Sequence, residues 1–82
     1  MNTKEILDLA EQIAPFLAGK ASLVQSAVLA ELTSRWLVGH IVLDSEAETL
    51  ELRAKLFAAH CKLVADLTDV NARDIHSALF GK

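Results

Sequence analysis

The stretch from Ser22 to Leu43 organises the apolar pattern of the chain, and it predicts one long helix with two apolar faces. At about 100° per residue, one face carries Val28, Leu29, Leu32, Trp36 and Leu43, and the other Leu23, Ala27, Ala30, Leu37, Val38 and Ile41. A helix at the surface of a small protein cannot keep two apolar sides away from water. We therefore expect the remaining segments to pack around this one.

The segment before it predicts an amphipathic helix that begins after Asn2. Its apolar side carries Ile6, Leu9, Ala10, Ile13, Phe16 and Leu17. Pro15 falls on the polar side and lacks the N–H of a helical hydrogen bond, so we expect a kink there. The helix is expected to end near Ala14 and to continue as a short turn to Ala18, with Gly19 as the residue that follows its end.

Two more helices are predicted in the second half of the chain. The first runs from about Glu46 to Leu67, and the pairs Glu51–Lys55 and Lys62–Asp66 have the i,i+4 spacing of ion pairs along its outer face. Thr68-Asp69 is expected to form a turn. A short last helix then runs from about Ala72 to Phe80, and Gly81 stops it.

Capping signals mark where these helices start. In four places a polar residue is followed three positions later by an acid or an amide. The pairs are Asn2–Glu5, Ser22–Gln25, Ser45–Glu48 and Asn71–Asp74. Because the connection at Asp44-Ser45 is short, the helices before and after it are expected to be antiparallel neighbours. The sequence thus predicts an all-α fold: a small bundle of about four helices, with two long central helices, a Pro-kinked N-terminal helix and a short C-terminal helix.

Length and composition set the scale of this bundle. The 82 residues suffice for one helical domain, 1–82, and 52% of them are apolar. Average soluble domains are about 45–50% apolar, and a domain this small buries only about 60% of its unfolded surface. An Ala-rich core accounts for part of the excess. The two-faced helix favours a second copy, or another helical protein, as a cover for the rest.

The charge and the cysteine content limit which binding partners and which cellular compartment we expect. The formal net charge is −3 and the basic residues are scattered among acids, so a nucleic-acid-binding function is not expected. Glu31, Arg35 and His40 interrupt the central apolar stretch, which argues against a membrane span. The single cysteine, Cys61, cannot form an internal disulfide and fits a reducing compartment. We expect a cytoplasmic protein.

Arg53 and His60 are the least expected residues of the pattern, because both fall on the apolar face of the third predicted helix. An unpaired charge buried there is costly, so each needs a partner or water. Arg53 can extend to an edge while His60 is a hydrogen-bonded core residue. Alternatively, this face meets a second subunit and Arg53 pairs with a carboxylate such as Glu31.

No constellation in the sequence has the spacing of a metal or catalytic site. His60 and Cys61 are adjacent, which points them about 100° apart on a helix, and His40 and His76 form no ligand pair with them. Cys61 is expected to be a small core residue. No glycine-rich phosphate loop or nucleophile motif occurs. We expect no metal, no cofactor and no catalytic activity.

Asp44-Ser45 before a helix resembles the phosphopantetheine-attachment site of acyl carrier proteins, where the serine of an Asp-Ser-Leu motif opens a helix and carries the prosthetic arm. That resemblance implies Ser45 as the attachment residue. It covers only these two residues, since Glu46 stands where the family has an apolar residue. Asp-Ser at a helix start is also ordinary capping chemistry.

The leading hypothesis is therefore a non-catalytic protein–protein interaction module, a homodimer or a partner of another helical protein. Its candidate interface residues are Leu32, Trp36, His40, Arg53, Phe57, His60 and Val64. The main alternative is a bundle that binds a small molecule or acyl chain in an apolar cavity. A helix-turn-helix DNA-binding function is disfavoured by charge and helix length.

Overall fold

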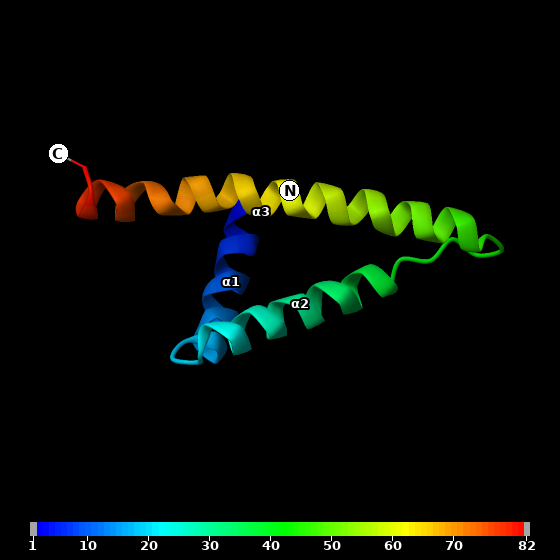
Figure 1. The fold of residues 1–82 in the computed structure, drawn as a ribbon, viewed down its shortest axis with the longest axis horizontal. Coiled ribbons are helices and arrows are strands. Elements are labelled where there is room, and N and C mark those ends of the chain that lie inside the picture. The colour runs from blue at the N-terminus through cyan, green and yellow to red at the C-terminus, as the bar shows by residue number, and fades with distance from the viewer. Residues whose placement is uncertain (1, 82) are drawn as a thin grey trace. The chain divides into compact units, whose positions relative to one another are not determined.

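The structure, a computed structural model, describes residues 2–81 and is all-α over that range. It contains α1 (Thr3–Leu17), α2 (Ser22–Val38) and α3 (Glu46–Leu79) (Figure 1). No strand occurs between residues 2 and 81. The predicted fold class is confirmed, but three helices replace the predicted four.

The start of α1 follows the capping prediction and its end does not. The Asn2 side chain accepts a hydrogen bond from the N–H of Glu5 at 3.1 Å. Pro15 lies inside the helix, which continues to Leu17 instead of ending near Ala14. Proline removes one backbone donor, while the N–H of Ala18 still donates to Ala14 O at 3.1 Å. Gly19 follows with a φ of 78°, the left-handed conformation expected after a helix end.

The junction between α1 and α2 is held by a contact that the capping prediction missed. Ser22 is the first residue of α2, and the N–H of Gln25 donates to Ala21 O at 3.0 Å. The Gln25 side chain donates to Leu17 O at 2.8 Å instead of closing a capping box with Ser22. This bond occupies a carbonyl that the end of α1 leaves without a helical partner.

The α2 helix is shorter than predicted, because it ends at Val38 and not at Leu43. Beyond it, the N–H of His40 donates to Leu37 O at 3.0 Å, a contact over three residues that tightens the last turn. Gly39 lies directly at this end, and its high conformational entropy disfavours helix continuation. Residues 40–45 form the connection, in which Asp44 has a φ of 71°.

The α3 helix is longer than predicted and merges the last two expected helices into 34 residues. The predicted turn at Thr68-Asp69 and the new helix start at Asn71 are both wrong. Thr68 instead donates its hydroxyl to Val64 O at 2.7 Å, within the helix. No glycine or proline lies between Ser45 and Phe80, so nothing in this stretch forces the helix to stop. The helix ends at Leu79, just before Gly81, as predicted.

The predicted ion pairs of α3 are confirmed. Lys55 Nζ lies 3.0 Å from Glu51 Oε1, and Lys62 Nζ lies 2.7 Å from Asp66 Oδ2. All four side chains are largely exposed, so each pair stabilises the helix by only about 0.3–0.5 kcal/mol.

The chain divides into an N-terminal unit up to Ser34 and a C-terminal unit from Arg35, and the boundary falls inside α2. Neither unit buries a hydrophobic side chain among residues 2–81, where only Thr49 is buried. The expectation that α2 is enclosed on both sides is therefore wrong for this chain alone. Leu29 is 52% exposed on one face of α2, and Leu23 is 85% exposed on the other. A single domain over 1–82 stays a prediction.

Over the part of the chain that the structure describes, none of the three helices has both the length and the apolar character that crossing a bilayer requires.

Candidate interaction site at the start of α3

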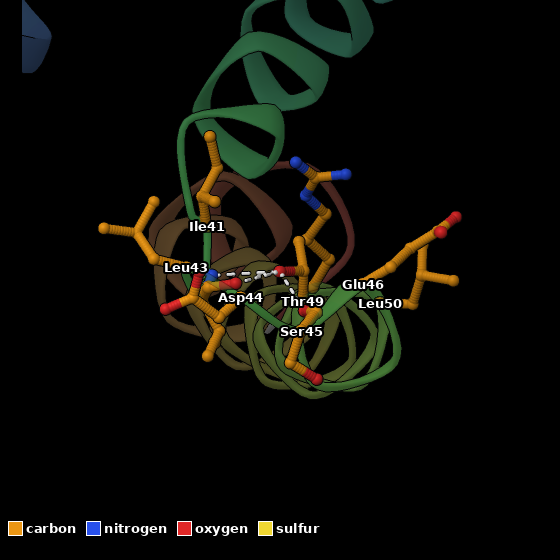
Figure 2. Close-up of a pocket in the computed structure, with 9 residues that line it drawn as sticks. Ile41, Leu43, Asp44, Ser45, Glu46, Thr49 and Leu50 are labelled. Carbon is orange, nitrogen blue, oxygen red and sulfur yellow. Dashed lines mark hydrogen bonds between the residues drawn. The ribbon is translucent and has the colours of Figure 1, made fainter.

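The connection from α2 to α3 is anchored by the hydroxyl of Thr49, in the first turn of α3. This oxygen accepts from the N–H of Val42 at 2.9 Å and lies 3.0 Å from Val42 O and 2.8 Å from Ser45 O (Figure 2). Its single hydrogen is donated to one of these two carbonyls at a time. Thr49 is only 7% exposed, so these bonds are well shielded from water. One side chain thus bonds both the middle and the end of the connection.

The side chain of Arg53, one turn further along α3, bonds backbone carbonyls at the end of α2. Its Nε donates to His40 O at 3.2 Å, and its Nη2 donates to Val38 O at 3.0 Å. These carbonyls lie at the C-terminal end of a helix, where the helix dipole favours a positive charge. The half-buried guanidinium therefore bonds backbone carbonyls in its own chain, a partner that the sequence interpretation did not include. Pairing with a carboxylate such as Glu31 of a second subunit stays a prediction.

Trp36 is in contact with two histidines, one from the connection and one from α3. Its ring centroid lies 5.2 Å from that of His40 in an edge-to-face arrangement, and 5.4 Å from that of His60. The Nδ1–H of His40 donates to Trp36 O at 2.8 Å. His60 is half-buried, whereas Trp36 is 43% exposed. The indole is therefore partly covered within the C-terminal unit and partly open to a further partner.

An open hollow of about 500 Å³ lies beside the connection, and Figure 2 shows side chains around it. Its lining residues are Ile41, Val42, Leu43, Asp44, Ser45, Glu46, Thr49, Leu50 and Arg53. Ser45, the residue of the carrier-protein resemblance, accepts from the N–H of Glu48 at 3.1 Å through its hydroxyl. It therefore acts as the cap of α3, as capping chemistry predicts.

The C-terminal unit brings four of the seven predicted interface residues together: Trp36, His40, Arg53 and His60. Phe57 and Val64, further along α3, are each 50% exposed. Leu32 belongs to the N-terminal unit and is 51% exposed. Sequence reasoning missed Thr49. Its position four residues after the cap Ser45 was the available signal, because a threonine there can bond back to the carbonyl of the cap residue.

Between residues 2 and 81, no three His, Cys, Asp or Glu side chains lie close enough together to hold a metal ion. Cys61 is exposed, which corrects its assignment to the core.

Comparison with models of known protein families, with curated proteins and with solved structures finds no match to this chain.

Replacing Thr49 by valine tests the anchor. The variant keeps the shape of the side chain but leaves the N–H of Val42 without its partner, so we expect a loss of about 1–3 kcal/mol in the free energy of unfolding. Thr68→Val is the matched control, because Thr68 makes one hydroxyl–carbonyl bond on the exposed surface of the same helix. Urea unfolding followed by circular dichroism measures both. Equal losses would contradict an anchoring role for Thr49.

Replacing Arg53 by methionine removes both hydrogen bonds to the end of α2 and keeps most of the aliphatic stem. We expect a loss of about 1–2 kcal/mol in unfolding free energy, since each is a charged hydrogen bond at a partly exposed site. Arg53→Lys keeps the charge but not the two-pronged geometry, so we expect an intermediate loss. A lysine variant as unstable as the methionine variant would show that charge at the helix end contributes nothing.

Proposed function

We propose that this chain is a non-catalytic helical interaction module that self-associates through its apolar helix faces. The observation that carries the proposal is the absence of a buried hydrophobic side chain between residues 2 and 81, in a chain that is 52% apolar. Burial of apolar surface is the main favourable term in folding and association. A chain that does not cover this surface itself gains stability from a partner that does.

The exposed apolar side chains also suit a partner protein. Leu23 of α2 is 85% exposed, and Leu50 and Leu63 of α3 are 57% and 47% exposed. Obligate homodimer interfaces are rich in such side chains, because they resemble a domain core divided between two chains.

The chemistry of the exposed residues also suits a protein partner. Trp36, Phe57 and Val64 are 43–50% exposed, and aromatic residues are favoured anchors in the centre of interfaces. Arg53 and His60 lie on the same helix as polar positions within the apolar surface. Such groups fix the register of some helical interfaces. We assign them that role in the proposed assembly.

We expect light scattering on a dilute sample to give twice the chain mass. Phe57→Ser removes an aromatic side chain from the proposed interface and should weaken association by at least tenfold. Phe16→Ser is the matched control, because Phe16 lies in α1, outside the candidate interface residues of α2 and α3. A wild-type monomer would contradict the proposal, and a monomer that co-purifies with lipid would favour the acyl-chain alternative.

Trp36, the only tryptophan, provides an independent readout. It is 43% exposed in one chain, so its emission should shift to shorter wavelength as rising concentration drives association and removes water from the indole. Fluorescence spectra over a dilution series measure the shift, and its midpoint should agree with the mass measurement. An emission maximum independent of concentration across the measured dissociation range would contradict a place for Trp36 in the interface.

A further inference from the structure

Seven residues of α3 follow an alternating spacing of three and four positions. These residues, which we call the α3 seam, are Arg53, Leu56, His60, Leu63, Leu67, Val70 and Asp74. The mean spacing of 3.5 residues is the repeat by which helices pair side by side in coiled coils. The α3 seam begins and ends with charges of opposite sign and is apolar between them except at His60.

The two halves of the α3 seam differ in how far they are covered. Arg53, Leu56 and His60 are half-buried, and the first and last of these contact the end of α2 and its connection. Beyond His60, every residue up to Gly81 is exposed except the half-buried Ala72. Leu63, Leu67 and Val70 are 46–53% exposed. Helices in proteins gain most of their stability from packing of an apolar face, so this half of the α3 seam requires a partner.

The order of the charges along the α3 seam indicates whether the α3 helix of a second chain runs parallel or antiparallel to the first. In a parallel pair, each seam residue faces its own copy, so Arg53 meets Arg53 and Asp74 meets Asp74. In an antiparallel pair centred near Leu63, Arg53 of one chain comes within about one turn of Asp74 of the partner subunit. Arg53 already uses Nε and Nη2 on the end of α2, and its Nη1 remains as the donor to a carboxylate.

We propose that two copies of this chain associate through an antiparallel pair of α3 helices, related by a two-fold axis near Leu63, with Arg53 of each chain near Asp74 of the partner subunit. The inference rests on the proposed self-association and adds its surface and symmetry. The exposed half of each α3 seam then packs against the half-buried part of the other. A two-fold arrangement closes the assembly at two chains.

A charge substitution tests the pairing of Arg53 with Asp74. Asp74→Arg places like charges together at both ends of the proposed pair, and it should weaken association by at least tenfold in sedimentation experiments. Asp69→Arg is the matched control, because it makes the same change in charge on the opposite side of α3. Equal effects of the two substitutions would overturn the assignment of Asp74 to the interface.

Distances between spin labels show directly whether the two α3 helices are parallel or antiparallel. In a Cys61→Ser background, Glu51→Cys, Lys62→Cys and Arg73→Cys place one label each on the outer side of α3, away from the α3 seam. With a rise of 1.5 Å per residue, the antiparallel arrangement separates the two copies of the label along the axis by roughly 36 Å at position 51 and roughly 30 Å at position 73. The labels at 62 lie near the two-fold axis and should be much closer. Electron–electron double resonance measures the three distances.

The outcomes separate this inference from the proposed function. Three equal distances in a sample of dimeric mass would overturn the antiparallel pairing and leave self-association standing. Absence of dipolar coupling in a sample of monomeric mass would overturn both. A short distance at 62 with long distances at 51 and 73, in labelled chains whose helix content by circular dichroism matches the unlabelled chain, is the result that we expect.

Discussion

Apolar surface in contact with water is the constraint on which the rest of this structure depends. Each square ångström of such surface costs roughly 25 cal/mol relative to burial, and no hydrophobic side chain is buried between residues 2 and 81. The free energy at stake is large beside the few kcal/mol by which small domains are stable. The helices are locally well formed, but their apolar faces provide stability only when something covers them.

Local polar contacts define the fold where apolar packing does not. The hydroxyl of Thr49 and the guanidinium of Arg53 bond backbone groups of Val38, His40, Val42 and Ser45, where α2 ends and α3 begins. Backbone groups there lack helical partners, so a connection without these side chains would expose them or leave them unsatisfied. Arg53 therefore has a structural role within one chain and, in the proposed assembly, a second role toward Asp74 of the partner subunit. The two roles use different nitrogens of one guanidinium.

The predictions that succeeded rest on short-range physics. Asn2 and Ser45 cap their helices as the capping spacing indicates, and the i,i+4 ion pairs form because helical geometry alone brings such residues together. Predictions of helix ends failed where weak local signals competed. Pro15 costs one hydrogen bond and does not end α1, while Thr68 and Asp69 are tolerated within α3. The cost of continuing a helix through Gly39 exceeds the gain from the apolar residues that follow it, so α2 ends at Val38.

The sequence by itself determined that the chain is helical, where α1 and α3 start and which residues are apolar, because these follow from capping, periodicity and composition. It also singled out Arg53 and His60 as misplaced on an apolar face. Only the tertiary structure showed what they contact: Arg53 bonds the carbonyls at the end of α2, and His60 lies against Trp36. These contacts join residues up to 24 positions apart. No local pattern encodes them, since they depend on where α2 ends and how residues 40–45 turn the chain.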